Sequence, residues 1–223
     1  MRLFRRLVLV ATLAGMLSGA LAALLHQALT VPLILRAEVL EETAAGHADA
    51  HARGNDQESV VRLASTVLTQ SLAAIGFSLL LLSASVVSRS RLDARRGVAW
   101  GLAGFAVFFL APGLGLPPTL PGAQEAALPD RQLWWWLTVL LTSAGLALAV
   151  FGRRWYLLLA GAVVVLLPHI IGAPQPIEHA SVAPEEWTQR FVATAALGNL
   201  LFWLLLGGLT GFFQARMQED SRP

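Results

Sequence analysis

The sequence predicts an all-α, polytopic membrane protein with about six transmembrane helices in a single integral-membrane domain, residues 1–223. Composition is the first reason: of the 223 residues, 56% are hydrophobic and only 13% are charged, against roughly 25% charged in an average soluble domain. A soluble core of this size could not bury so much apolar surface. The apolar residues also gather into six runs that can each cross a bilayer, which takes about 17–25 helical residues. The arginines, finally, alternate between loops as membrane topology requires.

We place the spans, in chain order, at about 7–29, 63–87, 97–115, 134–151, 155–172 and 191–213. The first follows a basic start that resembles a signal peptide. Its apolar run is longer than the 7–15 residues of a signal-peptide core, however, so we expect an uncleaved helix.

The connections between spans carry their own signals. The third span ends in a stretch rich in Pro and Gly, 111–118, which predicts a rigid loop. Only three residues, 152–154, separate the fourth and fifth spans, which predicts a tight helical hairpin. Trp134, Trp135 and Trp136 stand where the fourth span begins, as expected of anchors at the membrane interface.

The arginines orient the chain. Eleven of the 16 fall in alternate loops and at the two ends: Arg2, Arg5, Arg6, Arg89, Arg91, Arg95, Arg96, Arg153, Arg154, Arg216 and Arg222. Because cytoplasmic loops retain positive charge, we expect both termini in the cytoplasm. Acidic residues follow the opposite pattern, with eleven of the 14 in the outer loops: Glu38, Glu41, Glu42, Asp49, Asp56, Glu58, Glu125, Asp130, Glu178, Glu185 and Glu186.

Several classes of chemistry are excluded by residues that the chain lacks. All 16 cationic side chains are arginines, which excludes a Walker A phosphate loop and lysine Schiff bases. The absence of cysteine excludes thiolate nucleophiles, iron–sulfur clusters and Cys zinc sites. No basic patch interleaved with aromatic residues occurs, so we expect no nucleic-acid partner. We expect membrane lipid around the chain and no prosthetic group.

The five histidines all fall in the outer half of the predicted topology. His47 and His51 lie in the first outer loop, residues 30–62, and His179 lies in the last. His26 and His169 lie near the outer ends of the first and fifth spans. Imidazole and carboxylate groups are ligands for divalent Co, Ni, Zn, Fe and Mn, so this distribution predicts a metal-facing outer surface.

The first outer loop also supplies three acidic candidate ligands, Glu38, Glu41 and Glu42. On a helix, Glu38 would share a face with the other two, and His47 would share one with His51, so that two side chains reach one ion. The alternative is a solvated acidic surface, because residues 43–57 are rich in Ala, Gly and Asp and match no tight metal motif.

His169 is the only ionisable group well inside a predicted span, where it follows Pro168. A polar ring in that position requires a partner or a water-filled path. Two interpretations stay open: a functional role for His169 on an ion path, or a hydrogen bond that satisfies it in the packed interior.

Six segments together resemble a known family, CbtA, predicted cobalt transporter subunits of bacteria. They are FRR at 4–6, PLILRAE at 32–38, GLPPTLPG at 115–122, RQLWW at 131–135, PHIIGAPQP at 168–176 and LLFW at 200–203. The resemblance covers nearly the whole chain. The resemblance implies that the chain lies in the cytoplasmic (inner) membrane of a bacterium and functions together with a small single-span subunit, CbtB, whose tail is typically His-rich. It also implies an association with cobalamin synthesis. By position it implicates Glu38, His169 and the first loop, which here carries only His47 and His51.

Our leading hypothesis is a permease subunit for uptake of a divalent metal, with cobalt implied by the resemblance. The candidate ligands are His26, Glu38, Glu41, Glu42, His47, His51, His169 and His179. The alternative is a non-transporting scaffold or assembly factor that docks a periplasmic partner through loop 30–62. An integral-membrane enzyme is disfavoured, because His169 has no carboxylate neighbour in its own span.

Overall fold

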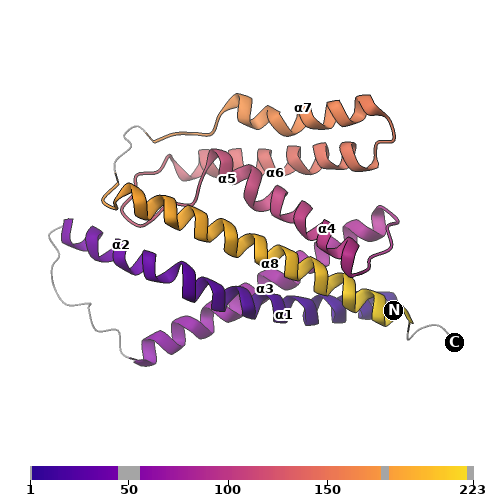
Figure 1. Cartoon of the computed structure of the whole chain (residues 1–223), viewed down its shortest axis with the longest axis horizontal. Coiled ribbons are helices and arrows are strands. Elements are labelled where there is room, and N and C mark those ends of the chain that lie inside the picture. Colours follow the sequence, from indigo (N-terminus) through magenta and orange to yellow (C-terminus); the bar gives the residue numbers. More distant parts are fainter. Residues whose placement is uncertain (1, 45–55, 177–180, 220–223) are drawn as a thin grey trace. The chain divides into compact units, whose positions relative to one another are not determined.

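The computed structural model is built from helices (Figure 1) and describes residues 2–44, 56–176 and 181–219. In chain order the elements are α1 (Arg2–Leu29), α2 (Val31–Ala44), α3 (Asp56–Val87), α4 (Ala94–Phe105), the π-helical segment η1 (Ala106–Leu110), α5 (Ala111–Gly115), α6 (Leu128–Phe151), α7 (Trp155–Ile171) and α8 (Glu185–Glu219). Within the described ranges, the only β pairing is an isolated bridge between Ala123 and Ser181. The predicted all-α class is confirmed.

Five stretches are long and apolar enough to cross a membrane: Phe4–Leu29, Val60–Val87, Ala94–Gly115, Leu128–Phe151 and Glu185–Gln218. They coincide with five of the six predicted spans. The remaining one, α7, has 17 residues and a length of about 26 Å, slightly less than the roughly 30 Å of a bilayer's hydrocarbon core. The polytopic membrane character is therefore confirmed, with α7 as the shortest apolar helix of the set.

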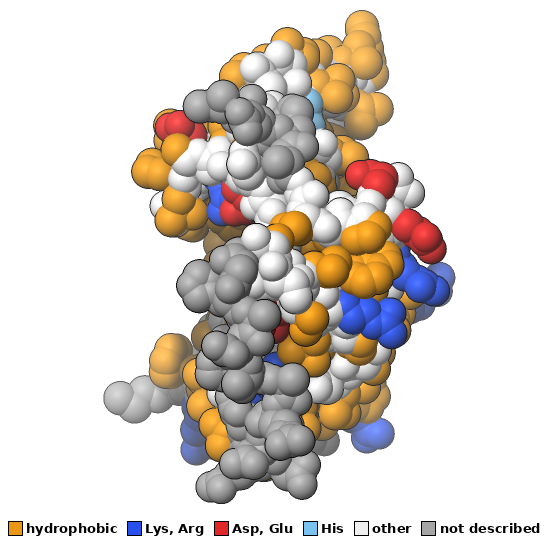
Figure 2. Space-filling view, turned by 90° about the vertical axis from the view of Figure 1, so that its left-hand side faces the viewer, with side chains coloured by type: hydrophobic (Ala, Val, Ile, Leu, Met, Phe, Trp, Pro, Cys, Tyr) orange, Lys and Arg blue, Asp and Glu red, His pale blue; other side chains and the backbone are white. Residues whose placement is uncertain are grey.

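Large hydrophobic side chains remain exposed along these helices. Figure 2 shows them over much of the face that it presents, interrupted by groups of charged residues. Val87 of α3, Trp155 of α7 and Ile170 of α7, for example, are each at least three-quarters exposed. In water such surfaces would be costly, whereas lipid chains cover them without loss.

The chain divides into two compact units, each considered by itself. Unit 1 comprises Met1–Pro32, Ala48–Gly104 and Leu197–Pro223, and unit 2 comprises Leu33–His47 and Phe105–Ala196. Unit 1 thus contains α1, α3, nearly all of α4 and the second part of α8. Unit 2 contains most of α2, then η1, α5, α6, α7 and the start of α8.

In unit 1, α1 packs along α3 (Figure 1) because small residues let the backbones approach. A methyl group on Gly15 would lie 2.6 Å from the Ile75 side chain. Val10, Ala11, Leu82 and Leu92 form the apolar core of this unit.

The contact of α4 with α8 in unit 1 is closer still. A Cβ on Gly97 would overlap the carbonyl oxygen of Gly207, and a Cβ on Gly101 would overlap that of Trp203. In the same way, a Cβ on Gly211 of α8 would overlap the carbonyl oxygen of Asp93. The glycines stand four residues apart on both helices, the spacing that lets membrane helices approach closely. Nearby, the hydroxyls of Ser78 and Thr210, both fully buried, are joined by a 2.8 Å hydrogen bond between α3 and α8.

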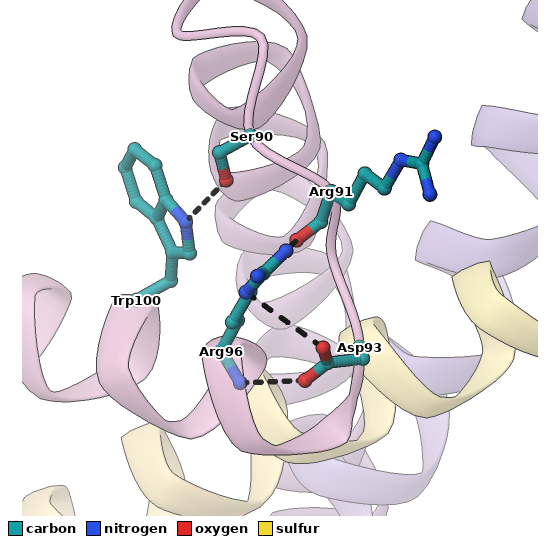
Figure 3. A network of polar contacts seen from close by, with 5 residues as sticks. All are labelled: Ser90, Arg91, Asp93, Arg96 and Trp100. Carbon is teal, nitrogen blue, oxygen red and sulfur yellow. Dashed lines mark hydrogen bonds and ion pairs between the residues drawn. The ribbon is translucent and has the colours of Figure 1, made fainter.

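The turn between α3 and α4 is fixed by a polar network (Figure 3). Asp93 caps α4 by accepting a 2.9 Å hydrogen bond from the Arg96 backbone N–H, and its carboxylate lies 3.8 Å from the Arg96 guanidinium. Arg96 also donates to the carbonyl of Arg91 at 3.1 Å, and the Trp100 indole donates to the Ser90 hydroxyl at 3.4 Å. This turn carries four of the arginines that the topology argument assigns to the cytoplasm.

In unit 2, α6 and α7 form the predicted hairpin and run side by side (Figure 1). Gly145 and Gly161 face each other, since a Cβ on Gly145 would lie 2.6 Å from the Gly161 carbonyl.

The predicted outer loop 30–62 is partly helical. Helix α2 occupies its first part, and α3 begins at Asp56, ahead of the predicted residue 63. Leu33 and Ala37 of α2 are buried with Leu120, Ala183 and Phe191.

Candidate functional site

The third span does not break at its proline. The helix of α4 continues through η1 and α5 to Gly115, with Pro112 inside it. A proline lacks an N–H and its ring presses on the carbonyl four residues earlier. In the π segment the Ala111 N–H bonds instead to Ala106, five residues earlier. The widened turn directly before Pro112 accommodates the ring, and π segments of this kind are frequent at functional sites.

Next to this segment, His169 links α7 to α5. Its Nε2 lies 3.0 Å from the Ala111 carbonyl oxygen and its Nδ1 lies 3.2 Å from the Val165 carbonyl oxygen. A neutral imidazole carries one N–H, so one of these contacts is a hydrogen bond and the other nitrogen offers a lone pair. The packing hydrogen bond considered for His169 is therefore present, and the ring is only partly buried.

Trp134 completes the contact between α5, α6 and α7. Its indole N–H donates to the Pro168 carbonyl at 3.2 Å, and its ring meets the His169 ring edge-on at 5.9 Å between centroids. The Trp134 side chain is buried, so its predicted role as an interfacial anchor is wrong. Three successive residues of a helix point in directions about 100° apart, and here Trp134 points into the unit while Trp136 stays more than half exposed.

A pocket of about 670 Å³ lies beside this cluster, entirely within unit 2. Its walls come from both ends of the loop that joins α5 to α6, the first turns of α6 and the segment after α7. The lining residues are Gly115, Leu116, Pro117, Pro118, Thr119, Gln124, Glu125, Ala126, Leu128, Arg131, Gln132, Trp135, Trp136, Pro174, Gln175 and Pro176. In the predicted topology these loops face the outside of the cell.

A charged pair lies in the pocket wall. Arg131, on the first turns of α6, forms a salt bridge with Glu125 of the preceding loop. The Thr119 hydroxyl donates to the same carboxylate. The three residues connect the loop that follows α5 to the start of α6, so the polar side of the pocket has a defined shape.

The three acidic candidates lie on α2, and all are exposed. The condition under which Glu38 would share a helix face with Glu41 and Glu42 is met, because α2 runs through Ala44. Glu41 borders the loop after α5: its Cβ lies 3.4 Å from the position that a Cβ on Gly122 would take. Gly122 itself has a φ of +77°, a conformation that favours glycine.

Of the remaining candidate histidines, one belongs to unit 1 and three lie outside the described residues. His26 lies in the last turn of α1 in unit 1, where its Nδ1 lies 2.5 Å from the Thr30 hydroxyl. His47, His51 and His179 fall outside the described residues. In the described part of the chain, no three His, Asp or Glu side chains are arranged to hold a metal ion.

Comparison with known proteins gives one match. The family model described as "probable cobalt transporter subunit (CbtA)" matches residues 4–215. The chain belongs to the CbtA family. No curated protein and no solved structure matches. Together with its apolar helices, this membership makes the chain a multi-pass membrane protein of a family described as probable cobalt transporter subunits.

The pocket unites segments on which the CbtA resemblance rests. Three of the six segments, 115–122, 131–135 and 168–176, each contribute to its lining, and two of them also supply Trp134 and His169. Segment 32–38 begins α2, which packs against Leu120 of the same loop. Family features that are far apart in the sequence therefore converge within unit 2.

Sequence reasoning missed the pocket residues Thr119, Glu125 and Arg131 as a group. The signal that was present was the clustering of Pro, Gly and Trp in the segments that carry the CbtA resemblance. Nothing in the sequence paired those segments, since the ion pair of Glu125 with Arg131 depends on how the loop folds back on α6.

Proposed function

We propose that this CbtA protein is a permease subunit for divalent cobalt uptake in the bacterial cytoplasmic membrane, with both termini in the cytoplasm. Its working partner would be a small single-span, His-rich subunit of the CbtB type, and the imported metal would serve cobalamin synthesis. Catalysis of its own is not part of this proposal. The observation that carries it is the family match over residues 4–215.

Capture of the ion begins at the outer surface in this proposal. The outer loops hold eleven acidic residues and five arginines, and such a negative surface raises the local concentration of divalent cations. Glu38, Glu41 and Glu42 would make the first contacts from α2, with His26, His47, His51 and His179 as further ligands. Modest affinity suits this role, because a site that binds an ion too tightly does not release it onward.

His169 would act as a relay within the fifth span. Metal-binding histidines usually donate the second ring N–H to a carbonyl or carboxylate, which fixes the ring and its tautomer. The 3.0 Å contact from Nε2 to the Ala111 carbonyl supports such an arrangement. It would leave the lone pair of Nδ1 for the ion, after a small rotation away from the Val165 carbonyl.

The preference for cobalt follows from the family and not from the ligand types. Nitrogen and oxygen donors generally bind Ni²⁺, Cu²⁺ and Zn²⁺ at least as tightly as Co²⁺. Selection in favour of cobalt would therefore need a constrained geometry or ligands from the partner subunit.

The test is uptake of radiolabelled Co²⁺ by cells that express the chain with and without its partner. We expect uptake above that of an empty-vector strain when both subunits are present, with Zn²⁺ and Ni²⁺ as competitors that measure selectivity. Absence of uptake in both strains would refute the permease role. The scaffold alternative holds instead if a periplasmic partner still co-purifies with the chain and replacement of His47, His51, His169 and His179 by Ala leaves the metal sensitivity of the cells unchanged.

A further inference from the structure

The pocket beside α6 has a property that metal transport does not explain: it places opposite charges next to an apolar helix surface. We propose that it binds the headgroup of a zwitterionic phospholipid with a primary ammonium group, the phosphoethanolamine class. This inference is independent of the cobalt proposal, since it rests on the pocket alone.

The charges of the pocket complement those of such a headgroup. A guanidinium has five N–H donors, and among the described residues the Arg131 guanidinium meets one oxygen of Glu125. Its other donors are available for a phosphate, which arginine binds in a forked geometry. Glu125 can in turn accept hydrogen bonds from an ammonium group, while Thr119 keeps the carboxylate in position.

The apolar side of the pocket is continuous with an exposed apolar stripe of α6. Trp136 lines the pocket and is 57% exposed, and Leu133 and Leu140 on the same helical face are 72% and 63% exposed. These residues recur at the spacing of one helix face. A ligand with its polar end at Arg131 would therefore lay an apolar tail along this stripe, which a soluble chelate or a free phosphate would not use.

Size and rigidity also fit. The volume of about 670 Å³ lies within the range of about 300–1,000 Å³ that is typical of ligand sites. Pro117, Pro118, Pro174 and Pro176 form part of the wall, and proline restricts the backbone. A wall that is already ordered loses little conformational entropy when a ligand binds.

The experiment is native mass spectrometry of the purified, delipidated full-length chain with three lipids of identical acyl chains. These are phosphatidylethanolamine, phosphatidylcholine and phosphatidylglycerol. We expect the ethanolamine lipid to bind about threefold to tenfold more tightly than the choline lipid, because a trimethylammonium cannot donate hydrogen bonds to Glu125. Inorganic phosphate at millimolar concentration should compete only weakly, because it lacks the ammonium and the tail.

Two variants and a control separate the parts of the site. Glu125→Gln should abolish the preference for ethanolamine over choline, and Arg131→Gln should weaken binding of all three lipids. Arg190→Gln is the matched control, because Arg190 is an exposed arginine of unit 2 outside the pocket lining. It should leave binding unchanged.

Three results would overturn the proposal. Equal binding of ethanolamine and choline lipids by the wild-type chain would remove the role of Glu125. Strongest binding of phosphatidylglycerol, or full displacement by inorganic phosphate, would indicate a simple anion site at Arg131. Equal losses in the Arg131 and Arg190 variants would indicate general attraction to arginines. Thermal unfolding of each variant establishes that it is folded, and Glu125→Gln alone still decides the question if Arg131→Gln is not.

Discussion

Substitution of His169 separates its packing role from a role as a metal ligand. With the proposed tautomer, in which Nε2 carries the proton, His169→Ala removes the hydrogen bond to Ala111 and the edge-on contact with Trp134. The net value of the first is about 0.5–1.5 kcal/mol, and that of an aromatic contact is also about 0.5–1.5 kcal/mol. The expected loss is therefore about 1–3 kcal/mol, or roughly 2–12 °C in Tm for a chain of this length.

His169→Gln is the informative comparison. The amide nitrogen of glutamine can take the position of Nε2 and keep the donor to Ala111, so about half of the stability loss should be recovered. An amide is a poor ligand for Co²⁺ compared with imidazole. If His169 is a relay, both variants should lose Co²⁺ uptake although their stabilities differ.

The assay combines thermal unfolding in detergent with Co²⁺ uptake in cells at matched expression. Ile170→Ala is the control, because this neighbour on α7 is 75% exposed and should change neither quantity appreciably. Wild-type uptake by the glutamine variant would refute the ligand role and leave only the hydrogen bond. Equal Tm values for the alanine variant and the wild-type chain would refute the packing argument.

Two further predictions concern unit 1. Gly207→Leu should destabilise the chain by about 1–3 kcal/mol, because its Cβ would overlap the Gly97 carbonyl. Gly208→Leu should cost far less, since a Cβ at this position contacts only the Val98 side chain, at 3.4 Å. Similar Tm values for the two variants would contradict the close packing of α4 on α8. Ser78→Ala and Thr210→Val should each destabilise the chain, yet the double variant should lose about 0.5–1.5 kcal/mol less than their sum, because neither hydroxyl is then left without its partner. Additive losses in chemical unfolding would show that the 2.8 Å bond contributes nothing.

The spans could be predicted from sequence because each helix signals itself locally, through a long apolar run with arginines at alternate ends. Helix α2 was hidden within the predicted outer loop, because what buries Leu33 and Ala37 is a contact with Leu120, more than 80 residues away in the chain. The predicted third span, 97–115, already ran through Pro112, but the π turn that accommodates the proline ring was not foreseen, since a local rule counts proline as a helix break.

The candidate site also combines features that the local sequence reveals with contacts that depend on the fold. His169 was recognised because an imidazole inside an apolar run is conspicuous, but its partner Ala111 carries no signal in its side chain. Burial of Trp134 was missed because three tryptophans at a span end are typical of an interface. Close helix packing could have been predicted from the four-residue spacing of Gly97 and Gly101 and of Gly207 and Gly211.

Cysteine labelling can test whether α2 and the pocket loops face the outside of the cell, on which the proposed capture of the ion depends. The natural chain has no cysteine, so single Ala→Cys variants report one position each. We predict that Ala44→Cys at the end of α2 and Ala127→Cys before α6 react with a membrane-impermeant maleimide on intact cells. Ala94→Cys, at the start of α4, should react only after permeabilisation. Labelling of Ala94→Cys on intact cells, with Ala44→Cys and Ala127→Cys protected, would show that the topology is the reverse of the predicted one.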